Sequence, residues 1–309
     1  MILNILLLII GFLLLSKGAD LLVDGAANVA RRFNIPEIII GLTIVAMGTS
    51  APEAAVSISS VIRGASGVGI GNILGSNIAN ILLILGISAL ISDLYVQKNT
   101  VLYEIPFVCF ISALLMVMGW QYGVLSYGCA TILCVLFAMF TMYLFVISQK
   151  QKQKTTDTPV ENMSVLKMIG CVLVGIIALV FGAKITVNSA TDIARICNVS
   201  ERIIGLTIVA FGTSLPELVT CIVAAAKKYS DIVIGNIIGS NIFNILFVLG
   251  ITGLIRPIPF ENAFLIDSAW GIITSVLLFI FVFHNKKLTK IKGLFFIVLY
   301  IIYLVCLIR

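Results

Sequence analysis

The sequence predicts an all-α integral membrane protein with ten transmembrane helices, arranged as two five-helix repeats of inverted topology. Three observations predict this fold class. The chain is strongly apolar, its apolar segments are long enough to cross a bilayer, and a short motif occurs twice at a fixed offset. Together they place most of the chain inside a membrane.

The composition excludes a soluble globular domain. Of the 309 residues, 60% are hydrophobic and 11% are charged, with a mean hydropathy of +1.17, whereas soluble domains carry about 25% charged residues. The net charge of +6 is therefore informative about loop orientation and gives no reason to expect nucleic-acid binding. The seven cysteines form no CxxC motif and no Cys/His cluster, so we expect buried apolar side chains, not disulfides or metal ligands.

Ten apolar segments have about the 20 residues that a transmembrane helix needs. They lie at 2–22, 38–62, 68–92, 101–119, 124–147, 165–187, 203–226, 232–255, 262–283 and 292–308. The first of them lacks a basic start and a cleavage site, so we expect a transmembrane helix and not a signal peptide. Five segments lie on each side of a polar stretch, which predicts a first repeat at 1–147, a short cytoplasmic linker at 148–164 and a second repeat at 165–309.

Two halves of the chain share a motif. The sequence "GLTIVAMGTSAPE" at 41–53 returns as "GLTIVAFGTSLPE" at 205–217, with 11 of 13 positions identical and an offset of 164 residues. The same offset relates "GNILGSNIANIL" at 71–82 to "GNIIGSNIFNIL" at 235–246. The repeated regions therefore extend over 41–91 and 205–255.

The distribution of lysine and arginine predicts the orientation. In the ten-helix layout, one face holds twelve of these residues near the helix ends and the other face holds six, which places the linker in the cytoplasm and both termini outside. Because five helices per half is an odd number, the two repeats must enter the membrane in opposite directions. Such inverted repeats are typical of secondary transporters, whose substrate site lies near the midplane where the repeats meet.

Each motif places a glutamate after a proline within an apolar segment. A carboxylate at the centre of a membrane helix costs about 2.5–3.5 kcal/mol on insertion scales, so Glu53 and Glu217 indicate an ion pathway. A structural role as protonated, hydrogen-bonded glutamates is the alternative. Pro52 and Pro216 lack an N–H and break the helix locally, which is tolerated at membrane depth where the backbone lines a cavity.

Oxygen atoms are the common feature of the neighbouring residues. At helical spacing, one stripe in each repeat carries a carbonyl, hydroxyls and the carboxylate: Ala46, Thr49, Ser50 and Glu53, and Ala210, Thr213, Ser214 and Glu217. A second stripe repeats at an interval of four residues: Asn72, Ser76 and Asn80, and Asn236, Ser240 and Asn244. Helix packing through the GxxxG pairs is the alternative reading of the second motif. Such oxygens are the ligands that Ca²⁺ prefers, and we expect both glutamates and both terminal asparagines to converge.

At these residues the sequence resembles the two α-repeats of the sodium/calcium exchanger family, in particular its prokaryotic members, within the cation/calcium exchanger superfamily. The resemblance implies four central cation sites, one selective for Ca²⁺ and the others suited to Na⁺, with Glu53 and Glu217 shared by both ions. It implies further metal ligands through hydroxyl, carbonyl or amide oxygens at Thr49, Ser50, Thr213, Ser214, Ala46, Ala210, Ser76, Ser240, Asn80 and Asn244. It also implies that the first and sixth helices slide across the other eight.

Two features distinguish the chain from its relatives. Potassium-dependent members carry aspartate at the position of Asn244, so the asparagine argues against potassium cotransport. Proton-coupled members typically carry Glu and His where this chain reads "GNILGSN", which makes Ca²⁺/H⁺ exchange the second hypothesis.

The predicted function is therefore secondary active antiport of Na⁺ for Ca²⁺ by alternating access, electrogenic at 3 Na⁺ to 1 Ca²⁺ as the family resemblance implies. An ion channel and an intramembrane hydrolase are the alternatives from other classes. The hydrolase is disfavoured because no histidine or lysine base is placed to activate Ser50 or Ser214. We expect a multi-pass protein of a prokaryotic plasma (inner) membrane that is not an enzyme and uses no cofactor. Its expected partners are Ca²⁺, Na⁺ and the lipid bilayer, with no nucleic acid and no obligate protein partner.

Overall fold

The computed structural model describes residues 1–150, 163–197 and 210–308 of the chain. In these residues the protein is helical, apart from two short two-stranded ribbons. This agrees with the all-α class that composition and hydropathy predict. All seven cysteines lie in the described part and are free. The expectation of burial holds for Cys129 and Cys221, whereas Cys197 and Cys306 are exposed.

The first half runs from α1 to α8. Its helical segments are α1 (Ile2–Arg32), α2 (Glu37–Ile40), η1 (Gly41–Val45), α3 (Ala46–Thr49), α4 (Ala51–Ile62), α5 (Ser66–Ala79), η2 (Asn80–Ile84), α6 (Leu85–Ile91), η3 (Thr100–Glu104), α7 (Ile105–Tyr122) and α8 (Tyr127–Lys150), where η marks a π-helical turn. Helix α1 is longer than the predicted 2–22. It continues because its last ten residues also pack inside the protein, with Val23, Ala26 and Ala30 almost fully buried.

The second half runs from α9 to α16. Its helical segments are α9 (Val165–Ile196), α11 (Ala210–Gly212), α12 (Leu215–Ala226), α13 (Ser230–Ile242), η5 (Phe243–Val248), α14 (Leu249–Ile255), α15 (Asn262–Phe283) and α16 (Lys290–Ile308). Parts of the predicted linker 148–164, of the predicted span 203–226 and of the second motif, up to residue 209, lie outside the described residues.

The described residues contain eight helices that are long and apolar enough to cross a membrane. A ninth candidate is the pair Glu37–Thr49 and Ala51–Ile62, which is bent by 48°. The predicted count of ten remains a prediction, because α12 is the described remainder of the predicted span 203–226. The continuous segments Ser66–Ile91 and Ser230–Ile255, which carry the second motif, are the most deeply buried of the eight.

Two antiparallel ribbons connect loops of the two halves. Strand β1 (Leu94–Tyr95) pairs with β4 (Lys287–Leu288), and β2 (Val124–Leu125) pairs with β3 (Ile258–Pro259). An ion pair of 2.8 Å between Lys287 and Asp93 joins the first ribbon, and the hydrogen bond from Lys287 lowers the pKa of Asp93 below its usual value. Adding 164 to β1 gives β3, and adding 164 to β2 gives 288–289, one residue beyond β4, so the repeat extends to the loops with a shift of one residue in the second strand.

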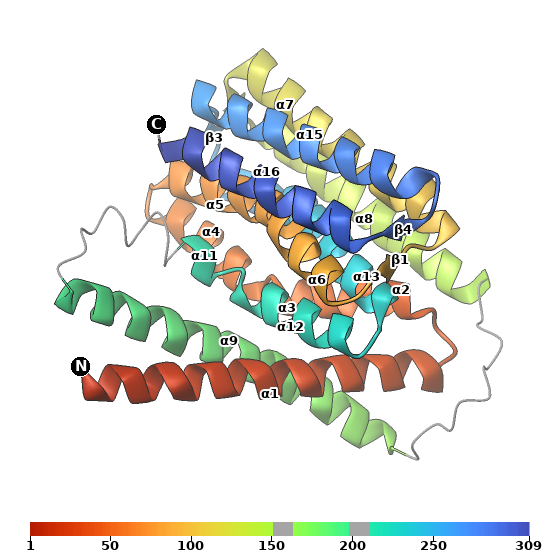
Figure 1. The fold of residues 1–309 in the computed structure, drawn as a ribbon. Helices are drawn as coiled ribbons and strands as arrows, with labels where there is room; N and C mark the ends of the chain where they lie inside the picture. Colours follow the sequence, from red (N-terminus) through yellow and green to blue (C-terminus); the bar gives the residue numbers. More distant parts are fainter. Residues whose placement is uncertain (151–162, 198–209, 309) are drawn as a thin grey trace.

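Helices α1 and α9 form a pair along one side of the molecule (Figure 1). They are antiparallel, since Gly18 of α1 contacts Gly175 of α9 while Gly25, further along α1, contacts Val172, earlier in α9. The backbones approach closely: a Cβ atom on Gly175 would lie 2.7 Å from the amide nitrogen of Leu22. Small residues permit such contact between membrane helices.

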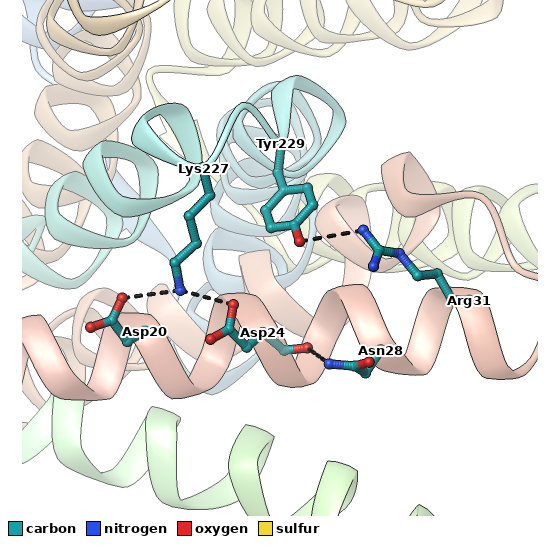
Figure 2. A network of polar contacts seen from close by, with 6 residues as sticks. All are labelled: Asp20, Asp24, Asn28, Arg31, Lys227 and Tyr229. Atoms are coloured by element: carbon teal, nitrogen blue, oxygen red, sulfur yellow. Dashed lines mark hydrogen bonds and ion pairs between the residues drawn. The ribbon is translucent and has the colours of Figure 1, made fainter. Parts of the chain in front are cut away.

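Charged side chains attach α1 to the second half of the protein. Lys227, just after α12, lies between Asp20 and Asp24 of α1, with Nζ–Oδ1 distances of 3.1 and 2.8 Å (Figure 2). Arg31 donates to the Tyr229 hydroxyl at 3.3 Å. Partial burial lowers the pKa of Lys227, and the hydrogen bonds to both aspartates raise it by more, so the lysine is charged at neutral pH. We call Lys227, Asp20 and Asp24 the α1 clamp.

Candidate cation site between the two motifs

The helix of the first motif breaks at Ser50, two residues before the proline. Helix α3 ends at Thr49 and α4 begins at Ala51, so Pro52 lies in the first turn of α4, where its missing N–H costs no hydrogen bond. Glu53 therefore lies at a helix start and not in mid-helix. The partial positive charge of a helix N-terminus stabilises a carboxylate there. Pro216 and Glu217 have the same positions in α12.

The two carboxyl groups lie inside the protein and contact each other's motif. Glu53 and Glu217 are each 1% exposed. Ser214 donates to Oε1 of Glu53 at 3.0 Å, and Ser50 donates to Oε1 of Glu217 at 2.7 Å. Each serine thus donates a hydrogen bond to the glutamate of the other half. Reciprocal contacts of this kind are the pattern that a twofold relation between two copies produces.

Four buried oxygen atoms in this region have no hydrogen-bond partner among the described residues. They are Oε2 of Glu53, Oε2 of Glu217, Oδ1 of Asn80 and Oδ1 of Asn244. Leaving a buried polar group unpaired costs about 1–3 kcal/mol, more for a charge. A cluster of such atoms calls for an explanation, and a bound cation supplies one because it accepts several hard oxygen ligands at once.

Among the described residues, no cationic side chain neutralises the two glutamates. Within residues 1–150, 163–197 and 210–308, no ion pair joins either carboxylate to a lysine, arginine or histidine. The site therefore has the composition of a cation receptor: two carboxyl groups, amides and hydroxyls, in a buried location. A bound counterion strongly stabilises the charged form of two carboxyl groups in such surroundings.

The remaining hydroxyls are engaged across the two halves. Thr49 donates to Oδ1 of Asn236 at 3.0 Å, and Thr213 donates to Oδ1 of Asn72 at 3.3 Å. These residues form a frame around the glutamates. The frame repeats at the same offset of 164 residues.

The other predicted ligands lie beside this frame. Ser240 donates to the Ala46 carbonyl at 3.5 Å, and Ser214 contacts the Ser76 hydroxyl at 3.3 Å. Helix α11 begins at Ala210, and the side chain of this residue is not among the described parts of the chain. Apart from Ala210, for which no contact is described, every predicted ligand makes a hydrogen bond across the two halves or carries one of the unpartnered oxygens.

The second motif also packs the halves together, as its GxxxG pattern predicts. A Cβ on Gly239 would lie 2.6 Å from the Leu42 carbonyl and 2.7 Å from Cβ of Ala46, so α13 lies directly against η1 and α3. The packing reading of the motif therefore holds for the second repeat, and the ligand role of its polar stripe stays a prediction.

Sequence reasoning missed Asn77 and Asn241. Nδ2 of Asn80 donates to Oδ1 of Asn241 at 3.0 Å, and Nδ2 of Asn244 donates to Oδ1 of Asn77 at 3.0 Å. The two asparagines lie outside the stripe of four-residue spacing that the sequence suggested, and their recurrence at the 164-residue offset is the signal that could have found them. A π-helical turn begins at or next to Asn80 and Asn244, a feature frequent at functional sites.

One substitution breaks the symmetry of the frame. Asn72 donates to the Ser57 hydroxyl at 3.1 Å, whereas its counterpart Asn236 donates to the Cys221 thiol at 3.3 Å. Ser57 and Cys221 are both fully buried. The two halves thus carry equivalent predicted ligands, and they differ in the residues that contact Asn72 and Asn236.

Comparison with known proteins agrees with the geometry. The family model described as "Sodium/calcium exchanger protein" matches residues 3–146 and 167–309. An uncharacterized membrane protein of Methanocaldococcus jannaschii is 36% identical over 95% of this chain and 94% of its own length. The sodium/calcium exchanger MaX1 of Methanosarcina acetivorans is 31% identical, with 98% of each chain covered. A structure of the sodium-calcium exchanger NCX_Mj, soaked with Na⁺ and Sr²⁺, superimposes with a TM-score of 0.87 at 34% identity, covering 99% of this chain and 98% of the other.

Proposed function

The chain belongs to the sodium/calcium exchanger family, as its sequence predicts, and from this premise we propose that it is a membrane antiporter that exchanges Na⁺ for Ca²⁺ at the site between the two motifs. The observation that carries the proposal is the set of four unpartnered buried oxygens on Glu53, Glu217, Asn80 and Asn244. Ca²⁺ takes 6–8 oxygen ligands, and hydroxyls and carbonyls beside these four supply the remainder.

The residues have distinct roles in this proposal. Glu53 and Glu217 provide the charge that either ion needs. Asn80 and Asn244 contribute neutral oxygens to the centre of the site. The remaining residues supply hydroxyl or carbonyl oxygens that complete the Ca²⁺ shell or hold Na⁺: Ala46, Thr49, Ser50, Ser76, Ala210, Thr213, Ser214 and Ser240.

Charge arithmetic explains why exchange is obligatory. Two carboxylates balance one Ca²⁺, and three Na⁺ would leave a charge of +1, so exchange at 3:1 moves net charge. Both ions use the same two glutamates, so one ion must leave before the other is bound. The empty site carries two unpaired buried charges, which oppose any transition without a bound ion.

The proposed topology is an inverted repeat of ten helices. It is supported by the antiparallel α1 and α9, which occupy equivalent places in the two halves, and by the paired loops of the two ribbons. The lysine and arginine distribution favours a cytoplasmic linker and external termini. With prokaryotic relatives described as membrane protein and exchanger, the proposed location is the plasma membrane of a prokaryote.

Alternating access is proposed to involve the α1–α9 pair, because it lies along the side of the other helices (Figure 1). Its glycine contacts hold the two helices against each other. Movement of the pair past α3 and α12 would open the site to one side and close it to the other.

Calcium uptake into sodium-loaded proteoliposomes tests the function. With pH clamped, vesicles are diluted into sodium-free or equal-sodium medium, and we expect radiolabelled Ca²⁺ uptake only when Na⁺ runs outward. Imposed membrane potentials then test the electrogenicity, and added K⁺ should have no effect. Uptake that follows an imposed pH gradient and ignores Na⁺ would replace the proposal with Ca²⁺/H⁺ exchange. Uptake that needs no gradient of either ion would point to a channel.

A further inference from the structure

Asn77 and Asn241 form a reciprocal bridge between α5 and α13. Nδ2 of Asn77 donates to the backbone carbonyl of Asn241 at 3.2 Å, and Nδ2 of Asn241 donates to the backbone carbonyl of Asn77 at 3.2 Å. The side chains are 6% and 1% exposed. Two amides that each bind a fixed backbone atom cannot exchange their oxygen and nitrogen ends without losing both contacts.

The bridge determines which end of Asn80 and Asn244 faces the cation site. Because Nδ2 of Asn241 is occupied by a carbonyl, its Oδ1 is left as an acceptor for Nδ2 of Asn80. The Asn80 oxygen is then left without a partner. If the Asn80 amide turned over, two acceptor oxygens would face each other and an N–H would replace the oxygen at the site.

The second half repeats this chain of contacts with the roles exchanged. Asn77 binds the Asn241 backbone carbonyl and accepts from Asn244, whose Oδ1 is again unpartnered. Each bridging amide therefore depends on the backbone of its counterpart and not on its side chain. Removing the side chain of Asn241 should release Asn80 and leave Asn244 in place.

We propose that Asn77 and Asn241 are positioning residues that direct the Asn244 and Asn80 oxygens, respectively, into the cation site. The inference rests on the proposed function only in taking Ca²⁺ as the ion bound there. Outer partners of this kind orient ligands, and their loss typically lowers metal affinity by about 10- to 100-fold.

The test is a set of double-mutant cycles on the full-length protein, with Ca²⁺ affinity measured by calorimetry in detergent. Asn241→Ala and Asn80→Ala should each weaken Ca²⁺ binding by about 10- to 100-fold. The double variant should bind Ca²⁺ with the same affinity as the single variant that binds it less tightly, because Asn241 acts through Asn80. Combining Asn241→Ala with Asn244→Ala should instead multiply the two losses. Asn77→Ala should show the mirror pattern, coupled to Asn244 and independent of Asn80.

Ser88→Ala is the matched control. Ser88 is fully buried and its hydroxyl donates to the Ile84 carbonyl within its own helix, away from the bridge. Its loss should leave Ca²⁺ affinity unchanged. If an alanine variant does not fold, Asn241→Leu keeps the branched shape and removes only the polar atoms.

Losses that multiply in every combination would overturn the inference, since they would mean general loosening of the core. Unchanged affinity in Asn77→Ala and Asn241→Ala would overturn it as well. Coupled losses in a protein that binds Ca²⁺ but shows no sodium-driven uptake would contradict the proposed function and support the bridge. Sodium-driven uptake together with affinity losses that multiply would support the proposed function and contradict the bridge. A protein that binds no Ca²⁺ would refute both.

Discussion

The two halves of the chain make equivalent contacts at the centre of the molecule and different contacts at its α1–α9 side. At the centre, the contacts of Glu53, Ser50, Asn77 and Asn80 recur in the other half at an offset of 164 residues. At the side, the α1 clamp has no counterpart. Positions 20, 24 and 227 correspond to Lys184, Asn188 and Arg63, and among the described residues no ion pair connects these three.

This difference separates two requirements of a transporter. A site that must accept the same ions from both sides benefits from equal ligands in both halves. The equilibrium between the two open states is set by contacts that exist in one state only. The unequal attachment of α1 and α9 can therefore bias the states without changing ion affinity at the centre.

Substitution of the glutamates should have the largest effect and tests the symmetry of the centre. Glu53→Gln and Glu217→Gln should each lower sodium-driven Ca²⁺ uptake by more than about 100-fold, beyond the usual loss of an outer partner. Both should keep or raise the melting temperature in ion-free detergent, because a buried charge without a partner is removed. Glu261→Gln, at an exposed position, is the control. Retained exchange in both variants would refute the site, and loss in only one would refute its symmetry.

The next largest effect should come from a third carboxylate. Asn244→Asp adds negative charge beside Glu53 and Glu217, and we expect altered ion coupling or K⁺ sensitivity, about a tenfold change in the Na⁺ or K⁺ dependence of uptake. Asn80→Asp is the matched variant in the first half. Similar changes in both variants would show that the two halves are equivalent at the centre. A response confined to Asn244→Asp would show that they are not.

Loosening the α1 clamp should have a moderate effect. The side chains of Lys227, Asp20 and Asp24 are roughly a third to a half exposed, so each ion pair contributes about 0.2–1 kcal/mol. Lys227→Met should change the ratio of the two open states by about two- to fivefold, measured by labelling single cysteines in the site region from each side. Ca²⁺ affinity in detergent should change less. Lys228→Met, at the neighbouring residue without an ion pair in the described part of the chain, should have neither effect.

The smallest effect should come from making the frame symmetric. Cys221→Ser gives Asn236 the same hydroxyl partner that Asn72 has in Ser57, and we expect Ca²⁺ affinity to change by less than about twofold. A larger change would mean that the outer frame is as important as the ligands. Ser57→Cys, the opposite exchange, should behave in the same way.

The sequence predicted the parts of this site that depend on residue type. The family assignment is confirmed, and the predicted ligands Glu53, Glu217, Asn80 and Asn244 are the residues that carry unpartnered oxygens. Their role as ligands remains a prediction. Helical spacing placed the first stripe on a buried face, and Ala46, Thr49, Ser50 and Glu53 are all buried although the helix breaks at Ser50. On the two sides of the break the neighbours differ, since α3 packs against α13 and α4 packs against α5.

The parts that depend on backbone detail could not be predicted. Helical periodicity holds for the stripe Asn72, Ser76 and Asn80, which lies along α5, but it cannot predict the π-helical turn that begins at Asn80. That turn has a different number of residues and changes which side chains share a face. The bridge of Asn77 and Asn241 also requires two helices from distant parts of the chain to cross at one point, which no local pattern specifies.

The bridge also bears on how such a chain can originate. Two separate copies of one half, related by a twofold axis, would make every contact of the Asn77–Asn241 bridge, because each contact occurs once per copy. The arrangement is therefore the one that a homodimer would show if its two subunits were joined into one chain by gene fusion. Fusion lets each copy acquire its own substitutions without imposing them on the other. The exchange of Ser57 for Cys221 and the one-sided clamp on α1 are differences that a dimer of identical subunits could not have evolved.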